Sequence, residues 1–212
     1  FAAAGLTTRI IIYDHNADRT DYPLAVLADT GARKYVDGSA FHLYGGNIAS
    51  LSDVHNAYPE KNLYFTEQWI GAPGNFANDL NWHVGTLIIG ATQNWCRSVL
   101  EWNLASDPGL SIHTPGGCSE CLGAVTISGS TVTRNPAYYI MAHAAKFVRP
   151  GSRRVESSQL GGLPNVAFVR PDGKTVLVVL NAATQAASFR IDDGAKNFVT
   201  SLRPGSVGTY VW

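Results

Sequence analysis

Four short apolar segments alternate with helix-like segments over the first hundred residues. The expected strands are residues 9–13, 39–44, 62–66 and 98–103. Helices are expected between them, over 22–36, over 50–57 and over a longer stretch whose apolar side chains recur with a period of 3.6, namely Phe76, Leu80, Val84, Leu87, Ile88, Ala91 and Trp95. Repeated strand–helix units of this kind predict a parallel sheet, with the first strand, RIIIY, buried on both faces.

The pattern changes after about residue 106. A loop rich in Gly and Pro runs to Gly123, a helix is expected over 136–147, and short alternating strands follow. Pro-Asp-Gly at residues 171–173 predicts a hairpin between the first two of these strands. The expected strands are 165–170, 174–181, 187–191, 198–202 and 209–212. They predict an antiparallel β-sandwich.

The number of repeats limits the architecture of the first part. A closed β/α barrel needs eight strands and about 250 residues, whereas this chain has four repeats in about 105. Either the sheet is small and open, or the chain holds half of a barrel, which we favour. The predicted fold class is therefore α/β plus β, with a half-barrel over residues 1–112 and a sandwich, its connecting loop and one helix over 113–212.

Composition excludes several classes of function. Lys plus Arg and Asp plus Glu both number 16, so the chain lacks the basic character of a nucleic-acid-binding protein. No apolar run approaches the roughly 20 residues of a membrane span. The N-terminal FAAAGLTTR lacks the basic and apolar regions of a signal peptide. Five Trp and nine Tyr residues suit either stacking on sugar rings or ordinary core packing.

The three cysteines predict neither a disulfide framework nor a metal site. Cys118 and Cys121 form a C-x-x-C in a loop, and Cys96 stands apart. No second C-x-x-C or His-x-x-x-His completes a zinc site, so we expect no metal. The pair is expected to be a disulfide within the loop or two free thiols.

Polar and aromatic side chains follow the expected strands at their carboxyl ends, where parallel β/α barrels carry out chemistry. A carboxylate among imidazole, phenol and indole groups is typical of a glycosidase, in which it attacks the anomeric carbon while aromatic faces hold the sugar. Plainer interpretations stay open: Glu67 as a solvated loop residue, His42 as a structural hydrogen-bonding group, Trp102 as core. The candidate residues are Asp14, His42, Tyr44, Glu67, Trp69, Trp102 and Asn103.

Seven motifs occur in an order that resembles one family. They are YDHN, AFHLYGG, LYFTEQW, LEWNLASDP, YYIMAHAAKFVRPGSRRV, VLVVLN and GTYVW. Together they resemble the C-terminal half of glycoside hydrolase family 30, which contains glucosylceramidases and endo-β-1,6-glucanases. The resemblance implies a retaining β-glycosidase, with strands five to eight of a (β/α)8 TIM barrel followed by most of a β-sandwich, and no cofactor.

The resemblance also implies roles for individual residues. Glu67 matches the nucleophile. His42 and Tyr44 match a pair that contacts the substrate and the nucleophile, and Asp14 matches an acidic position that ends the fifth strand. Trp102 and Asn103 match a substrate-binding Trp-Asn. Trp69 and the loop GGCSECLGAVTI resemble the β-1,6-glucanase branch of the family.

One family motif has no counterpart. The acid/base of the family is the Glu of an Asn-Glu-Pro tripeptide, which this chain lacks. We therefore expect the acid/base on an N-terminal half of the barrel, as a separate chain or missing segment. The expected substrate is a β-glucoside or β-glucan, and the expected location is secreted or periplasmic, with the signal outside this chain. Two rival hypotheses are a non-catalytic carbohydrate-binding fragment, for which Glu67→Gln would be silent, and a purely structural subunit.

Overall fold

The computed structural model describes residues 1–212, apart from the side chain of residue 2. Two compact units make up the chain. The first comprises Phe1–Gln68 and Gly90–Glu101, and the second comprises Trp69–Ile89 and Trp102–Trp212. The first unit contains the four-stranded parallel sheet and the short helices, and the second contains the antiparallel strands together with the helical residues 76–89 and 136–145.

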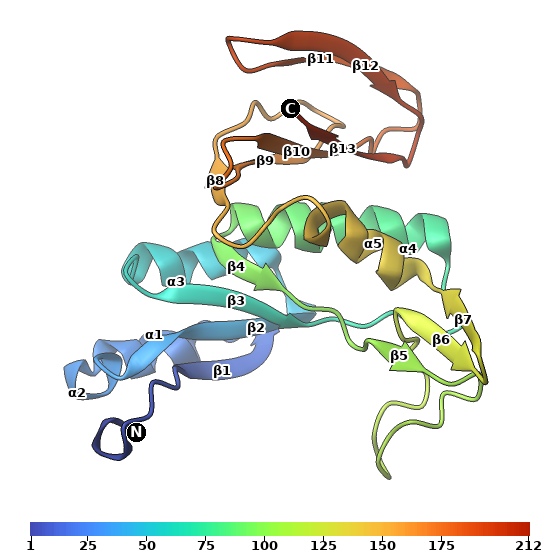
Figure 1. Ribbon diagram of the computed structural model, residues 1–212. Coiled ribbons are helices and arrows are strands. Elements are labelled where there is room, and N and C mark those ends of the chain that lie inside the picture. Colours follow the sequence, from blue (N-terminus) through green and yellow to red (C-terminus); the bar gives the residue numbers. More distant parts are fainter. The chain divides into compact units, whose positions relative to one another are not determined.

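The sheet of the first unit has the predicted parallel arrangement. Its strands lie in chain order, each paired in parallel with the next, as Figure 1 shows. They are β1 (Ile10–Ala17), β2 (Val36–Gly46), β3 (Asn62–Glu67) and β4 (Cys96–Val99). Sequential parallel pairing is the connectivity of neighbouring strands in a β/α barrel.

Burial in this sheet is uneven. Phe41 of β2 and Phe65 of β3 are fully buried, whereas Ile10 and Ile11 of β1 are 38% and 43% exposed. The prediction that β1 is buried on both faces is therefore wrong. Within the described part of the chain β1 pairs with β2 alone, so its outer edge has no strand neighbour.

The helix predicted over 22–36 is interrupted at Asp29. That residue has extended backbone (φ −75°, ψ 111°), and its side chain accepts hydrogen bonds from the amides of Gly31 and Ala32, at 2.6 and 3.1 Å. An Asp in this position ends one helix and caps the next. The short helices of this unit are η1 (Ala2–Ala4), α1 (Asp21–Ala28), α2 (Thr30–Arg33), η2 (Ile48–Ser50) and α3 (Leu51–Ala57).

The long periodic segment forms α4 (Phe76–His83) followed by a π-helical stretch, η3 (Val84–Ala91). The central apolar positions are buried, as predicted for Leu80, Val84 and Leu87. The outermost positions are not: Phe76, the first residue of α4, and Trp95, which lies beyond η3 with φ 74°, are 51% and 44% exposed. The periodicity is therefore confirmed in its centre and wrong at its ends.

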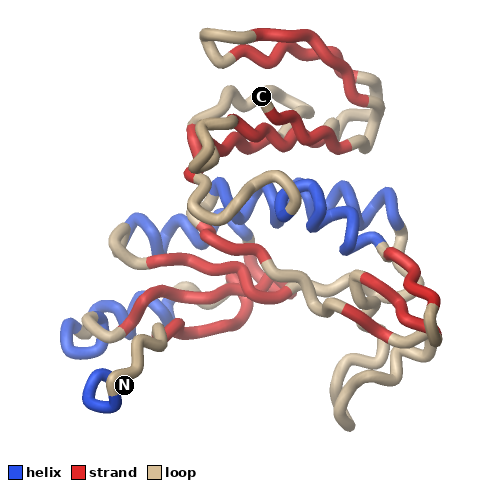
Figure 2. Tube along the Cα trace, in the orientation of Figure 1, coloured by secondary structure: helices blue, strands red, loops and turns tan.

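Antiparallel sheets form the C-terminal region, in agreement with the predicted sandwich. One has the strand order β13-β10-β9-β8, and a separate ribbon pairs β11 with β12; Figure 2 shows both as strands joined by short loops. Phe189 and Ile191 of the ribbon pack with Leu163 and Val179 of the other layer. The strands are β8 (Arg153–Val155), β9 (Asn165–Val169), β10 (Thr175–Leu180), β11 (Ala187–Asp192), β12 (Asn197–Leu202) and β13 (Val207–Val211).

A small three-stranded sheet was not predicted. It contains β5 (Ala105–Ser106), β6 (Val125–Ser128) and β7 (Thr131–Arg134), and α5 (Pro136–Ala145) follows. The β6–β7 hairpin closes through Gly129 and Ser130, with Gly129 at φ 58°. A Gly-Ser turn between alternating polar and β-branched residues was an available signal for it.

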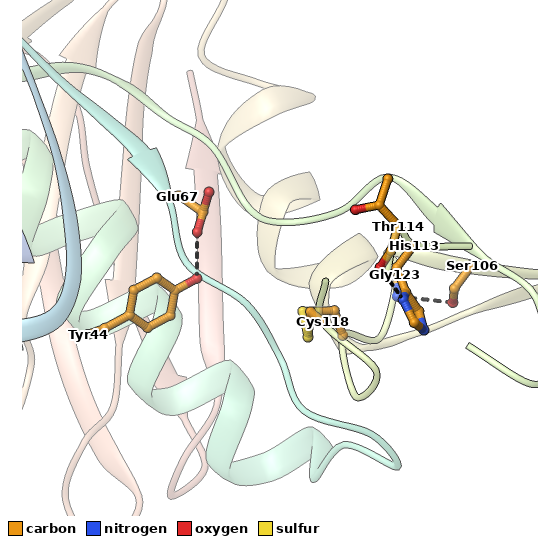
Figure 3. The surroundings of a disulfide bond; sticks show 8 residues. Tyr44, Glu67, Ser106, His113, Thr114, Cys118 and Gly123 are labelled. Carbon is orange, nitrogen blue, oxygen red and sulfur yellow. Dashed lines mark hydrogen bonds between the residues drawn. A yellow bond between two sulfur atoms is a disulfide. The ribbon is translucent and has the colours of Figure 1, made fainter. Parts of the chain in front are cut away.

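Cys118 and Cys121 form a disulfide within the loop between β5 and β6 (Figure 3). That loop is held to the segment after β3, because the amide of Ala72 donates to the carbonyl of Glu120 at 2.8 Å. Cys96 is a buried free thiol. Of the alternatives open from the sequence, the disulfide is the one present.

None of the helices in the described residues combines the length and apolar character that a bilayer crossing demands.

Candidate active site

The carboxyl ends of β1, β2 and β3 bring four predicted residues together. Asp14 comes from β1, His42 and Tyr44 from β2, and Glu67 from β3. His42 lies beside Glu67 in the register of β2 and β3. These ends meet because parallel neighbours finish at one edge of the sheet.

Hydrogen bonds and close contacts connect the four side chains. His42 lies between two carboxylates: its Nε2 is 3.1 Å from Oδ1 of Asp14, and its Nδ1 is 3.9 Å from Oε1 of Glu67. The hydroxyl of Tyr44 donates to the same Oε1 of Glu67 at 3.2 Å, the dashed contact on the left of Figure 3. One Glu67 oxygen thus faces both members of the His-x-Tyr pair.

A local irregularity in β1 sets the direction of the Asp14 side chain. Tyr13 and Asp14 have positive φ angles of 78° and 60°, and the register with β2 shifts between Tyr13 and His15. Such a bulge redirects a side chain out of the regular alternation. Asn16, two residues on, accepts a hydrogen bond from the backbone amide of Tyr44 at 3.0 Å and so holds the end of β2.

Two pKa shifts follow from this environment. The Thr66 hydroxyl is the largest cause that keeps the pKa of Asp14 below its ordinary value, and hydrogen bonding from His42 adds to it against partial burial. Burial, followed by the negative charge of Glu67, raises the pKa of Tyr44 well above its ordinary value. Asp14 is therefore ionised, and Tyr44 is a protonated donor, at neutral pH.

The three remaining predicted residues belong to the second unit. Trp69 and Trp102 are joined there by a parallel β-bridge, and the Trp102 side chain is half exposed. A cis peptide bond links Trp102 to Asn103, whose carbonyl accepts from the amide of Ala124 at 2.8 Å. The structure therefore forms two groups of predicted residues. One contains Trp69 and Trp102, and the other contains Asp14, His42, Tyr44 and Glu67.

Sequence reasoning missed Thr66 and Asn16. The register of β2 and β3 pairs Phe41 with Phe65 and His42 with Glu67, so Thr66 is the extra residue of a bulge. Regular alternation would direct Thr66 and Glu67 to opposite faces, which hides a joint role. The Thr-Glu dipeptide carries no other signal. Within the described residues no group of three or more His, Cys, Asp or Glu side chains is arranged to hold a metal.

A parallel β/α sheet with carboxylates at the carboxyl ends of its strands, followed by sandwich sheets, is typical of β/α-barrel enzymes that carry an accessory β-domain. Residues 2–148 match the TIM-barrel domain of glycosyl hydrolase family 30, and residues 151–210 match the β-sandwich domain of that family. The chain therefore belongs to glycosyl hydrolase family 30, which confirms the resemblance and the fold class inferred from the sequence.

Curated relatives include enzymes of two activities. The chain is 38% identical over 190 residues to an endo-1,6-β-D-glucanase of Aspergillus fumigatus, covering 85% of this chain and 37% of that enzyme. It is 29% identical over 204 residues to the lysosomal acid glucosylceramidase of Mus musculus, covering 88% and 39%. The chain thus spans less than two fifths of the length of either relative.

Solved structures agree with this placement. An endo-β1,6-glucanase superposes with a TM-score of 0.89 at 34% identity, over 100% of this chain and 50% of that one. SrfJ from Salmonella typhimurium superposes with a TM-score of 0.90 at 29% identity, over 100% and 49%. Both are about twice as long as the chain.

Proposed function

We propose that this chain supplies the nucleophile of a retaining β-glycoside hydrolase, and that the nucleophile is Glu67. The observation that carries the proposal is the position of Glu67 at the carboxyl end of β3, with one carboxylate oxygen facing both Tyr44 and His42. A carboxylate that accepts a hydrogen bond, as Glu67 does from the Tyr44 hydroxyl, is oriented for attack and is stabilised when it leaves again.

The chemistry needs two carboxyl groups about 5–5.5 Å apart. Glu67 attacks the anomeric carbon to form a glycosyl-enzyme as the glycosidic oxygen departs with a proton from the second carboxyl group. That group then removes a proton from water, which attacks the same carbon and releases Glu67. Asp14 is unsuited to be the acid, because its lowered pKa and its hydrogen bonds with Thr66 and His42 keep it ionised.

The acid/base is therefore assigned to a partner region, the N-terminal half of the barrel, on a separate chain or a longer form of this one. Support comes from the matched lengths, since the solved glucanase relative is about twice as long. Trp69, Trp102 and Asn103 are assigned to substrate binding, with indole faces suited to sugar rings.

The proposed substrate is a β-linked glucan or glucoside, with β-1,6-glucan ahead of glucosylceramide. The two relatives support this order, with 38% identity to an endo-1,6-β-D-glucanase and 29% to a glucosylceramidase. A secreted or periplasmic location is proposed as well, because the Cys118–Cys121 disulfide fits an oxidising compartment.

Mechanism-based labelling tests the assignment. The assembled protein is incubated with a 2-deoxy-2-fluoro-β-glucoside that carries a good leaving group, and is then analysed by intact and peptide mass spectrometry. We expect one glycosyl adduct on the peptide that contains Glu67. Glu67→Gln should abolish labelling and turnover, whereas Glu60→Gln, on an exposed turn before β3, should preserve both.

The rival outcome has a distinct signature. Sugar binding without turnover or adduct, unchanged by Glu67→Gln, would identify a carbohydrate-binding fragment and overturn the proposal.

A further inference from the structure

Thr66 occupies the bulge immediately before Glu67, and its hydroxyl turns toward β1. It donates to Oδ1 of Asp14 at 2.6 Å, and the carbonyl of Phe41 lies 3.4 Å from the same hydroxyl. The Asp14 oxygen that accepts from Thr66 is the one that faces Nε2 of His42. One carboxylate oxygen thus joins the bulge of β3 to the imidazole of β2.

From this geometry we infer that Thr66 is a positioning residue which, through Asp14, fixes the tautomer of His42 beside the nucleophile. The inference rests on the proposed function of Glu67. It also gives a role to Asp14, which the family resemblance matched to an acidic position at the end of the fifth strand: Asp14 orients His42.

The position of a single proton on the imidazole of His42 decides whether the nitrogen that faces Glu67 is a donor or an acceptor. An ionised carboxylate only accepts hydrogen bonds, so the imidazole nitrogen that faces Asp14 must carry a hydrogen. The proton of a neutral His42 is therefore held on Nε2, and the other nitrogen, Nδ1, is left facing Glu67 at 3.9 Å. Without the Thr66 hydroxyl, Asp14 loses its shortest hydrogen bond and the principal cause of its lowered pKa.

Other titratable groups near His42 do not replace this contact. His15 of β1 lies ring to ring at 6.2 Å, Tyr44 lies at 6.1 Å, and Glu67 faces the opposite nitrogen. Glu101, which follows β4, contributes negative charge at Tyr44. Asp14 is the group within hydrogen-bonding distance of Nε2.

The test compares Thr66→Val, which keeps the branched shape and removes the hydroxyl, with Thr66→Ser, which restores it. In the assembled enzyme we expect Thr66→Val to lower kcat/KM about tenfold, the effect of one hydrogen bond to a charged group. The acidic limb of its pH profile should move to higher pH, because the pKa of Asp14 returns toward its ordinary value. Thr66→Ser should reverse both changes, and Thr131→Val, on exposed β7, should cause neither.

A second readout does not depend on catalysis. Nitrogen-15 NMR of the histidine ring reports which nitrogen of His42 carries the proton, with the signal assigned by its loss in His42→Asn. We expect the Nε2–H tautomer in the wild type and a mixture in Thr66→Val. A wild-type Nδ1–H tautomer, or an unmoved pH profile in Thr66→Val, would overturn the inference. Absence of a Glu67 adduct would instead contradict the proposed function, so the two failures are distinguishable.

Discussion

Tyr44→Phe removes one hydroxyl from the candidate site and leaves the aromatic ring in place. The lost group is the donor that contacts Glu67 at 3.2 Å. In the proposed mechanism Glu67 loses its charge when the glycosyl-enzyme forms and regains it when water releases the sugar. A donor to this oxygen therefore assists the second step, deglycosylation, more than the first.

The magnitude follows from the distance and the exposure. A hydrogen bond to a charged group contributes about 1.5–3 kcal/mol. Tyr44 is 44% exposed and its contact is long, so the low end, about 1.5 kcal/mol or roughly tenfold in rate, is expected. Burial and the charge of Glu67 raise the pKa of Tyr44, so the hydroxyl stays protonated and the effect should be constant from about pH 5 to pH 9.

The assay is steady-state hydrolysis of an activated aryl β-glucoside, for which deglycosylation limits the rate. We expect kcat and KM to fall together about tenfold, while kcat/KM changes by less than about threefold. Reactivation of the 2-fluoroglycosyl-enzyme should slow by a similar factor. Tyr35→Phe, at a tyrosine that is 65% exposed, is the matched control.

Two results would refute this reasoning. One is a kcat for Tyr44→Phe within about twofold of the wild type, which is less than one such hydrogen bond contributes. The other is a fall in kcat/KM at unchanged KM, which would place the effect on the first step.

Three further outcomes concern stability. Burial alone would raise the pKa of Asp37, but hydrogen bonds from Tyr64 and Asn62 and the charge of Arg9 outweigh burial, so the pKa is lowered. The ionised Asp37 therefore stabilises the folded state above about pH 4, and this contribution is lost as the pH falls further. Urea unfolding should show that Asp37→Asn costs about 1–3 kcal/mol at pH 7 and flattens this acid dependence. Phe65→Ala, at a fully buried position, should cost about 3–5 kcal/mol by the same method, and a loss below about 1 kcal/mol would contradict the packing. Reducing the disulfide should expose two reactive thiols and cost about 2 kcal/mol, whereas the buried Cys96 thiol, whose pKa burial raises, should react only on unfolding.

Much of the fold could be predicted because periodicity reports burial directly. Short apolar runs on both sides of Pro-Asp-Gly located β9 and β10, and their register leaves that turn between them as predicted. The apolar run NLYFT located β3. Where local patterns were weak or ambiguous the prediction failed, as at Asp29, where a capping side chain stops a helix that apolar spacing alone would continue.

For the candidate site, the sequence by itself determined which groups lie near the carboxyl ends of β2 and β3, whereas β4 ends at Val99, short of the predicted Trp102 and Asn103. His42 and Tyr44, two residues apart on one strand, and Glu67 at the end of the next could be named from spacing alone. Only the tertiary structure decided how they meet. Bulges at Asp14 and Thr66 turn those side chains out of the regular alternation, and a bulge is set by the register between strands, which a single strand's sequence does not contain.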